Sequence, residues 1–331
     1  MQNTILDVSD LSICADTEEG QYDIVEQVDF SLQKGEILGI VGESGCGKSM
    51  TALSIAGLLP ENIRIRSGSI LFEGQELQLL KKNDLRAIQG KEISMIFQEP
   101  MTSLNPLMKI GRQVSENLRL HSSLSKQEIR NQSIHILGRV GLPHPEELMN
   151  AYPHELSGGM RQRVMIAIAV VCKPKLIIAD EPTTALDVTI QAQILDLLRE
   201  INHDFECALL FISHDLGVIS RLCNRIIVMY AGSIVEEGSA NNIFQHPVHE
   251  YTKGLIGSIP MRDRKGKRLT NIPGHVPALT EKRFGCPFAP RCGEAQASCF
   301  SQKPPCISLG PSHKVRCIEA EEEREMEYAG I

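Results

Sequence analysis

The sequence predicts an α/β fold in which buried parallel strands alternate with helices and lead to a phosphate-binding site. The first observation is a glycine-rich octapeptide, residues 42–49, between an apolar β-branched run and a helix-forming run. The second is the alternation of strand and helix patterns from about residue 175 onward, which is typical of a parallel sheet with covered faces. The third is an apolar segment, residues 176–181, that ends in two adjacent carboxylates.

The octapeptide predicts a nucleoside triphosphate ligand, because it matches a phosphate-binding loop at a helix N-terminus. Its glycines let the backbone turn tightly, Lys48 supplies a positive charge and the Ser49 hydroxyl is placed for Mg²⁺. The alternative is a glycine-rich turn with a surface lysine, and the flanking strand and helix argue against it. The residues predicted to bind ATP here are Gly42, Glu43, Ser44, Gly45, Cys46, Gly47, Lys48, Ser49 and Met50.

Composition restricts the class of protein. The 331 residues are 42% hydrophobic and 23% charged, which suits one large globular domain and a smaller one. A net charge of −7 argues against a nucleic-acid surface, which needs a basic stripe. The sequence has no apolar run near the ~18 residues that span a bilayer, and its first residues lack the pattern of a signal peptide. We therefore expect a cytoplasmic protein whose ten cysteines form no disulfide framework.

The other elements follow in chain order. Residues 4–40 alternate apolar and polar positions and predict short antiparallel strands, to which 68–74 adds a hairpin segment. Residues 92–97 predict a core strand, and the polar stretch 105–153 predicts an inserted helical subdomain. We then expect a helix over 157–172, a strand over 175–179, a helix over 190–205, a strand over 208–212 and a hairpin over 225–237. After residue 258, Pro, Gly and basic residues mark a linker into a cysteine-rich tail.

The two carboxylates after the strand at 175–179 indicate a catalytic role. A buried strand that ends in Asp180 directs this carboxylate at the Mg²⁺ shell. Glu181 then follows beside the γ-phosphate, where a carboxylate can polarise the attacking water. By itself such a strand end usually just enters a loop, and the phosphate-binding loop is what favours the catalytic interpretation.

Further motifs resemble the ATP-binding cassette (ABC) ATPases. Residues 156–160, Leu-Ser-Gly-Gly-Met, precede a helix and look like the signature sequence of that family. Gln98 matches the Q-loop glutamine, residues 185–187 (Ala-Leu-Asp) match the D-loop, and His214 matches the switch histidine. The resemblance implies a P-loop NTPase core of the ABC ATPase type, with an antiparallel β subdomain, an inserted α-helical subdomain and a small Cys-rich C-terminal extension.

The resemblance also implies roles for these residues. In this family two nucleotide domains face each other, and each ATP lies between the phosphate loop of one and the signature helix of the other. The signature residues implied to contact the partner's ATP are Ser157, Gly158, Gly159 and Met160, which stands where the family usually has Gln. The implied catalytic residues are Glu181 and His214, with Asp187 in the D-loop and Mg²⁺ held through Ser49, Gln98 and Asp180. Tyr22 is the candidate for stacking on adenine, and an ordinary surface tyrosine is the alternative.

Longer strings resemble the ATPase subunits of oligopeptide and dipeptide importers, whose relatives also carry nickel or metallophores. Residues 98–106 and 181–189 resemble the corresponding loops, and residues 272–274, 285–292 and 313–317 resemble the C-terminal extension. The likeness is closest to the D-type subunit. It implies an ABC ATPase domain over residues 1–258, with its helical subdomain at about 99–160, and an importer-type extension over 259–331.

This resemblance implies an ATP-hydrolysing translocase subunit that drives uptake of di- or oligopeptides across the cytoplasmic membrane. The implied partners are a paralogous ATPase subunit in a heterodimer, two transmembrane permease subunits and an extracytoplasmic substrate-binding protein. The chain would lie peripherally on the cytoplasmic face of the inner membrane. Two alternatives stay open: the same motor with nickel or a metallophore as cargo, and a soluble regulatory ABC ATPase that engages no membrane.

Four cysteines of the tail, Cys286, Cys292, Cys299 and Cys317, suggest a metal staple in a segment too small for much core. Their spacing does not match the paired cysteines of zinc ribbons, whereas iron–sulfur clusters tolerate varied spacing. The family resemblance implies a [4Fe–4S] cluster on these four, either structural or redox-sensing, with zinc and unligated thiols as alternatives. In the phosphate-binding loop, the positive helix N-terminus predicts a lowered pKa for Cys46.

Overall fold

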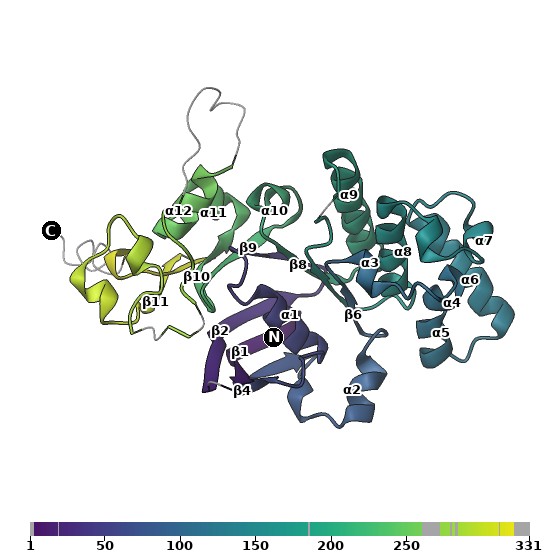
Figure 1. The fold of residues 1–331 in the computed structure, drawn as a ribbon, viewed down its shortest axis with the longest axis horizontal. Helices are drawn as coiled ribbons and strands as arrows, with labels where there is room; N and C mark the ends of the chain where they lie inside the picture. Colours follow the sequence, from purple (N-terminus) through teal and green to yellow (C-terminus); the bar gives the residue numbers. More distant parts are fainter. Residues whose placement is uncertain are drawn as a thin grey trace.

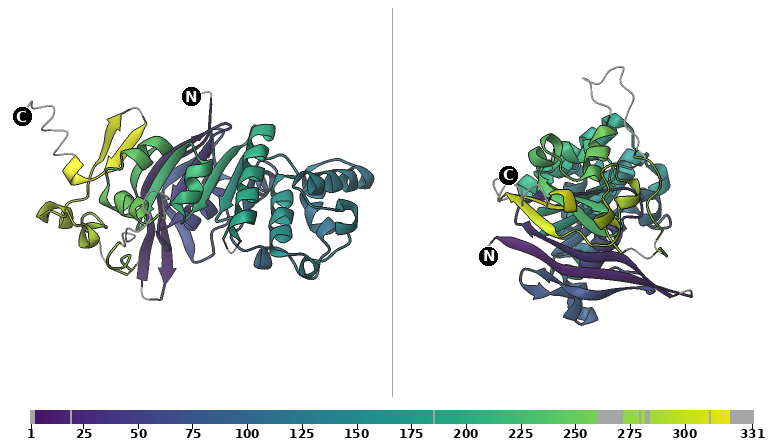
Figure 2. Two further views of the ribbon diagram at one scale, coloured as in Figure 1. Left: turned by 90° about the horizontal axis from the view of Figure 1, so that it is seen from above. Right: turned by 90° about the vertical axis from the view of Figure 1, so that its left-hand side faces the viewer.

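Two β-sheets organise the chain in the computed structural model, which describes residues 3–18, 20–184, 186–259, 272–278, 280–281, 284–310 and 312–320. Figure 1 shows the smaller sheet, with β1, β2 and β4, below the larger sheet that runs across the middle of the view. The helices α4 to α7 lie at one end of the molecule and the segment with β11 lies at the opposite end (Figures 1 and 2). The predicted α/β class is confirmed.

The smaller sheet is antiparallel and has the strand order β2-β1-β4-β5. Its strands are β1 (Thr4–Thr17), β2 (Gly20–Gln33), β4 (Ile63–Phe72) and β5 (Gln75–Glu76). The prediction of short strands before residue 40 was wrong, because β1 and β2 each run for 14 residues. Register shifts, such as the one between Val8 and Leu11, let a strand continue where the apolar–polar alternation breaks.

The larger sheet has the strand order β11-β12-β10-β9-β3-β8-β7-β6. Its strands are β3 (Ile37–Val41), β6 (Ile93–Ile96), β7 (Leu176–Asp180), β8 (Ala208–Ser213), β9 (Arg225–Tyr230), β10 (Ser233–Ser239), β11 (Cys306–Gly310) and β12 (His313–Arg316). The strands β6, β7, β8, β3 and β9 pair in parallel, as predicted, and β9 forms the predicted hairpin with β10. Because these parallel strands share a direction, the loops after β3, β6, β7 and β8 meet at one edge of the sheet.

The two faces of the larger sheet enter separate hydrophobic cores. Along β3, Leu38 and Ile40 pack with helix α1 (Lys48–Ala56) and the antiparallel sheet. Ile37 and Val41 belong to the core on the other face, which also contains side chains of α8 (Gly158–Val170), α9 (Val188–Phe205) and α10 (Leu216–Leu222). This alternation with period two, with both faces buried, is what a doubly covered parallel strand requires.

Helices follow β6 as a separate lobe, called the helical subdomain below. It contains α3 (Pro100–Ser103), α4 (Ile110–Val114), α5 (Glu116–His121), α6 (Lys126–Arg139) and α7 (Pro145–Leu148). The other helices are α2 (Lys82–Ile88), α8 (Gly158–Val170), α9 (Val188–Phe205), α10 (Leu216–Leu222), α11 (Ala240–Gln245) and α12 (Glu250–Gly257), with 3₁₀ turns at Leu77–Leu79, Pro153–Glu155, Ala289–Arg291 and Ala297–Phe300. Within the described residues, none of these helices has the length and apolarity needed to span a bilayer.

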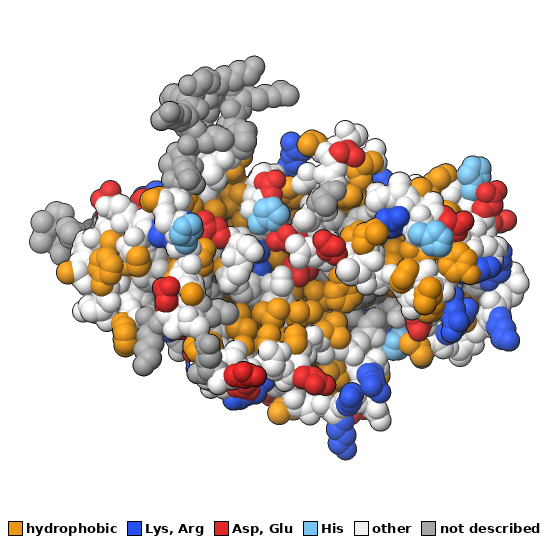
Figure 3. Space-filling view, in the orientation of Figure 1, with side chains coloured by type: hydrophobic (Ala, Val, Ile, Leu, Met, Phe, Trp, Pro, Cys, Tyr) orange, Lys and Arg blue, Asp and Glu red, His pale blue; other side chains and the backbone are white. Residues whose placement is uncertain are grey.

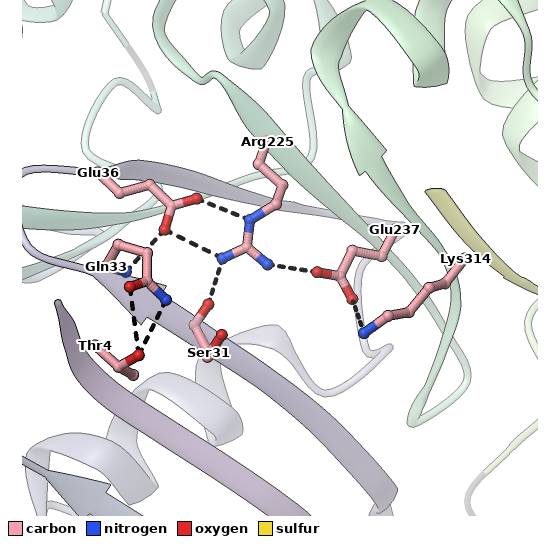
Figure 4. A network of polar contacts seen from close by, with 7 residues as sticks. All are labelled: Thr4, Ser31, Gln33, Glu36, Arg225, Glu237 and Lys314. Carbon is pink, nitrogen blue, oxygen red and sulfur yellow. Dashed lines mark hydrogen bonds and ion pairs between the residues drawn. The ribbon is translucent and has the colours of Figure 1, made fainter. Parts of the chain in front are cut away.

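The C-terminal extension joins the larger sheet through its last strands. β12 pairs antiparallel with β10, and β11 pairs with β12 at the edge. Figure 4 shows a network of polar contacts around Arg225 near this junction. The Arg225 guanidinium pairs with Glu36 and Glu237, and Glu237 lies 3.9 Å from the ammonium of Lys314 on β12. The domain boundary after residue 258 stays a prediction.

Candidate functional site

The loop from Gly42 to Gly47 leaves β3 and enters α1 at the edge where the parallel strands end. Gly45 and Gly47 have φ angles of 80° and 101°, in the left-handed region that favours glycine. A Cβ added to Gly42 would lie 2.2 Å from the carbonyl oxygen of Met229, so a side chain does not fit there. These glycines allow the loop to wrap around the N-terminus of α1, where backbone N–H groups favour an anion.

The ammonium group of Lys48 is held inside this loop. Its Nζ atom donates hydrogen bonds to the carbonyl oxygens of Gly42 at 2.8 Å and Glu43 at 3.0 Å. The residue is buried, with 5% of its surface exposed. Nζ also lies 3.8 Å from the sulfur of Cys46. A buried cation whose hydrogen bonds go to neutral groups at the base of a glycine-rich loop is well placed to bind a phosphate.

Ser49 and Asp180 form the part of the site that fits Mg²⁺. The Ser49 hydroxyl donates a hydrogen bond of 3.1 Å to Oδ1 of Asp180, which ends β7. Burial raises the pKa of the Asp180 carboxyl, and the hydrogen bond from Ser49 opposes that rise. Hydroxyl and carboxylate oxygens are suitable partners for a Mg²⁺ ion that also keeps waters and phosphate oxygens. Gln98, the third predicted Mg²⁺ partner, bonds to Glu181 instead.

One carboxylate oxygen of Glu181 contacts three neighbouring side chains. Its Oε2 atom accepts hydrogen bonds of 3.0 Å from Gln98 Nε2 and Thr184 Oγ1 and lies 3.0 Å from Nδ1 of His214. Gln98, Glu181 and His214 follow β6, β7 and β8, so the shared sheet edge brings them together. Glu181 has φ 46°, which is uncommon outside glycine and is found at functional sites. An ionised carboxylate oriented in this way can polarise a water molecule.

The predicted signature residues lie at the start of α8. The Ser157 hydroxyl caps this helix and accepts a hydrogen bond of 3.4 Å from the N–H of Met160. Gly158 is exposed, and a Cβ added there would meet no atom within 4 Å. A Cβ on Gly159 would lie 3.1 Å from a methyl group of Ile190 on α9. The helix N-terminus therefore presents open backbone on the surface of this chain, where an anion from outside can approach.

Asp187 has a structural role that the sequence did not predict. Its Oδ1 atom accepts hydrogen bonds from the N–H groups of Thr189 at 3.0 Å and Ile190 at 2.9 Å, so it is the N-cap of α9. Ala185 of the same D-loop lies outside the described residues. A role of Asp187 in communication between two nucleotide sites stays a prediction.

The other predicted ATP ligands differ in exposure. Ser44 and Gly45 are exposed at the tip of the loop, whereas Met50 packs half-buried against the core beneath α1. Tyr22 is half-buried near the start of β2 and lies opposite Ala15 of β1. Stacking of Tyr22 on adenine stays a prediction.

The prediction of a lowered pKa for Cys46 was wrong. Cys46 is fully buried, and this burial raises the pKa of its thiol above the ordinary value. The nearby Lys48 charge lowers the pKa by less, because removing a thiolate from water is the larger effect. The thiol therefore fills space beneath the loop, where a Cβ added to Gly42 would lie 2.7 Å from its sulfur.

The four cysteines of the extension, Cys286, Cys292, Cys299 and Cys317, are half-buried and free. The pKa of Cys286 is raised to about 11, chiefly by burial, and charges on Cys299 and Cys317 are among the smaller causes of this rise. The thiols therefore lie close enough to influence one another. Across the described ranges, however, no group of three or more His, Cys, Asp or Glu side chains is arranged to hold a metal ion. The predicted iron–sulfur cluster finds no support in this arrangement.

Sequence reasoning missed three residues that contact the site. Thr184 follows Glu181 by three positions, and this spacing within a tight turn was the available signal. Arg291 pairs with the carboxylate of Glu43, and the hydroxyl of Tyr251 accepts a hydrogen bond from the Glu43 N–H. Both come from more than 200 positions away in the chain, and no local pattern marks them.

Two family models match the sequence. The model described as ABC transporter matches residues 25–184, which include the phosphate-binding loop and Glu181. The model described as oligopeptide/dipeptide transporter, C-terminal region, matches residues 235–299, which include Arg291 and three of the four tail cysteines.

The chain is similar over almost its whole length to characterised transport proteins. It is 47% identical over 321 residues to the oligopeptide transport ATP-binding protein OppD of Salmonella typhimurium, covering 97% of this chain and 95% of OppD. It is 47% identical over 314 residues to the dipeptide transport ATP-binding protein DppD of Bacillus subtilis, covering 95% and 94%.

Solved structures share the fold at lower sequence identity. The dimeric bacterial ABC transporter cassette MJ0796 is 27% identical with a TM-score of 0.64, and the match covers 71% of this chain and 98% of that cassette. The cbiO1 subunit of the Clostridium perfringens cbiONQ transporter is 28% identical with a TM-score of 0.63, covering 74% and 92%.

Proposed function

This chain belongs to the ABC transporter family, among the oligopeptide and dipeptide transport ATP-binding proteins, and on that premise we propose that it hydrolyses ATP to drive uptake of di- or oligopeptides across the cytoplasmic membrane. The observation that carries the ATPase activity is the carboxylate of Glu181, held by Gln98, Thr184 and His214 beside the Ser49–Asp180 pair. Peptide cargo follows from the names of the relatives, OppD and DppD.

The geometry supports the following proposed roles within the site. Lys48 exchanges its bonds to loop carbonyls for phosphate oxygens, and Ser49 with Asp180 would hold Mg²⁺, which would supply positive charge beside the phosphates. Glu181 accepts a hydrogen bond from the attacking water and polarises it toward the γ-phosphate. His214 and Gln98 orient this carboxylate and contact the γ-phosphate side of the site.

A second ATPase subunit completes each nucleotide site in this proposal. The open N-terminus of α8, with Ser157, Gly158 and Gly159, offers a hydroxyl and backbone N–H groups to the γ-phosphate bound by the partner. Support comes from the dimeric cassette that this chain resembles and from the absence of any atom within 4 Å of a Cβ built on Gly158. The partner that we propose is a paralogous subunit, giving a heterodimer.

The helical subdomain is the part that we propose contacts the permease. Large apolar side chains are exposed just before and within its first part: Phe97 at 38%, Met101 at 61% and Leu107 at 87%. Figure 3 shows hydrophobic side chains, interspersed with Lys and Arg, over this lobe at the right of the view. Exposed apolar groups near Gln98 suit a cytoplasmic segment of a permease. The chain would then lie peripherally on the cytoplasmic face, in a complex with two permease subunits and an extracytoplasmic substrate-binding protein.

An iron–sulfur cluster on the four tail cysteines stays a separate proposal. Its support is the number and type of side chains alone, because Cys286, Cys292, Cys299 and Cys317 are free cysteines of one extension, and their arrangement in the described residues does not form a metal site. Four thiolates are the ligand set of a [4Fe–4S] cluster, which would act as a staple for this lobe. Anaerobic purification followed by iron and sulfide analysis tests the proposal, with about four of each per chain expected and a colourless, iron-free protein contradicting it.

Reconstitution tests the transport function. The chain is co-expressed with its permease, partner ATPase and binding protein, and the complex is placed in liposomes with ATP outside, on the side of the ATPase subunits. We expect ATP-dependent movement of a labelled tripeptide toward the ATP-containing side, stimulated by the binding protein. Nickel or a nickel chelate serves as the competing cargo. Transport of nickel but not of peptide would show that the cargo is nickel. Failure of the chain to co-purify with a permease would favour a soluble ABC ATPase.

A further inference from the structure

The phosphate-binding loop is bonded to the C-terminal extension through its second residue. Two nitrogens of the Arg291 guanidinium contact the two carboxylate oxygens of Glu43, Nη1 to Oε2 at 2.6 Å and Nη2 to Oε1 at 3.1 Å. The pair joins positions 248 residues apart. A bidentate arginine–carboxylate pair fixes both the position and the orientation of the carboxylate.

The surroundings of Arg291 hold its side chain in one place. The side chain is only 5% exposed, and its Nε atom donates a hydrogen bond of 2.7 Å to the carbonyl oxygen of Pro273. Nη1 also lies 3.2 Å from the hydroxyl of Tyr230, and the guanidinium stands over the Tyr230 ring at 5.7 Å. The contact with Glu43 raises the pKa of Arg291 further, so the guanidinium stays charged.

A second contact reaches the same loop residue through its backbone. The Glu43 N–H donates a hydrogen bond of 2.8 Å to the hydroxyl of the fully buried Tyr251. Tyr251 packs against Tyr230 with ring centroids 4.6 Å apart, and Phe288 of the extension lies against both rings at 5.4 Å and 5.2 Å. The extension therefore contacts Glu43 in two ways. Phe288 packs in the aromatic cluster whose Tyr251 bonds to the Glu43 backbone, and Arg291 pairs with the Glu43 side chain.

We propose that Arg291 is a positioning residue for ATP binding: the C-terminal extension holds Glu43, and through it the phosphate-binding loop, in the shape that accepts the triphosphate. The inference rests on the proposed ATPase function. Glu43 lies next to Gly42, and the carbonyl oxygens of both accept hydrogen bonds from Lys48, so movement of Glu43 displaces the cation that binds phosphate.

Charge gives the pair a second effect. Without Arg291, the Glu43 carboxylate is a partly buried anion within a loop that binds a polyanion. Removing one partner of such a pair leaves an uncompensated charge, and this is more damaging than removing both. Arg291 thus neutralises the loop as well as holding it. If the extension served only to attach to the ATPase core, substitution of Arg291 would change nucleotide affinity through neither of these effects.

Nucleotide binding to the purified full-length chain tests the proposal, with a fluorescent ATP analogue and Mg²⁺ as the probe. Arg291→Met is expected to raise the Kd about tenfold, the effect of losing one charged hydrogen-bonded partner. Arg291→Lys, which keeps the charge and loses the bidentate geometry, is expected to give an intermediate Kd and serves if the methionine variant does not fold. The double variant Arg291→Met with Glu43→Gln is expected to recover only part of the lost affinity, because the unpaired carboxylate is gone but the loop is still not held by Arg291.

Another ion pair between the extension and the core provides the matched control. Lys303 of the extension contacts Glu26 of β2 at 2.8 Å without contacting the loop. Lys303→Met is expected to leave the Kd unchanged. Wild-type affinity in both Arg291 variants would overturn the inference, as would full wild-type affinity in the double variant, because the loop would then bind ATP without being held. ATP turnover in the assembled complex with Lys48→Ala distinguishes the proposed function from this inference. Normal turnover in that complex would reject the proposed function. Lost turnover, together with wild-type Kd values in the Arg291 variants, would reject only the role of Arg291.

Discussion

The Oε2 atom of Glu181 lies 3.0 Å from Nδ1 of His214, and the two residues follow adjacent parallel strands of the larger sheet. Glu181 is largely buried, with 12% of its side chain exposed, whereas 57% of the His214 side chain is exposed. Most of the Glu181 carboxylate is therefore shielded from water by the protein, and the more exposed imidazole of His214 lies against it. In the function proposed above, Glu181 polarises the attacking water and His214 orients the Glu181 carboxylate, and this contact is the support for that division of roles.

Glu181→Gln tests the role of the carboxylate. The amide keeps the size of the side chain but polarises water poorly, so we expect kcat of the assembled complex to fall about 10²- to 10⁴-fold. ATP affinity should stay close to that of the wild type, because Lys48 and Ser49 are untouched. Phosphate release and equilibrium binding of ATP measure the two effects. A kcat within a factor of two of wild type would remove Glu181 from the catalytic role.

Thr184→Val tests whether the orientation of Glu181 matters. The substitution preserves shape and removes the hydroxyl that donates to Oε2 at 3.0 Å. We expect kcat to fall about threefold to tenfold, the effect of one hydrogen bond. Thr184→Ser, which restores the hydroxyl, is the control and should recover most of the activity. Equal losses in the two variants would contradict the prediction, because the hydroxyl kept in Thr184→Ser would then not be what orients Glu181.

Gly158→Ala tests whether the N-terminus of α8 serves a partner. A Cβ there meets no atom of the described residues within 4 Å, so the isolated subunit should keep its melting temperature and its ATP affinity. In the assembled complex the same methyl group would stand where the partner's γ-phosphate approaches, and turnover should fall at least about tenfold. Unchanged turnover in the complex would contradict the shared site.

His249 predicts how stability depends on pH. Burial lowers its pKa from 6.5 to about 4, and its Nδ1 atom accepts a hydrogen bond from the Tyr251 N–H. Between these two values the unfolded chain binds a proton that the folded chain does not. The free energy of unfolding should therefore fall by about 3 kcal/mol as the pH drops from 6.5 to 4.

His249→Asn provides the control for this prediction. Asparagine keeps an acceptor for the Tyr251 N–H and does not titrate. Denaturant unfolding at several pH values should show the difference in stability between wild type and variant shrinking by about 3 kcal/mol toward pH 4. A difference that is constant across this range would show that His249 is protonated in the folded protein.

Contiguous motifs made much of the ATP site predictable from sequence. The conformation of the loop from Gly42 to Ser49 is determined locally, because its glycines and the helix that follows decide how it folds. Glu181 was identified as a carboxylate at a strand end, whereas Gln98 and His214 were identified from the resemblance to ABC ATPases. Parallel strands then bring the ends that carry these three residues to one edge of the sheet.

Tertiary packing decided what the sequence could not predict. The pKa of Cys46 rises because the fold buries it, although its neighbours in the chain suggested the opposite. The contact between Arg291 and Glu43 depends on how the extension packs, and so does the pairing of β12 with β10. Interactions between distant segments leave no periodic or local signal in the sequence.

Peptide uptake by the reconstituted complex, with Lys48→Ala in this subunit alone, tests the central claim most directly. A triphosphate that is bound by Lys48 here and by a facing subunit's signature helix should lose its binding site when the ammonium is removed. We predict that ATP hydrolysis and peptide uptake both fall about 100-fold or more. Uptake and hydrolysis at wild-type rates would contradict the assignment of this chain as an active half of the motor.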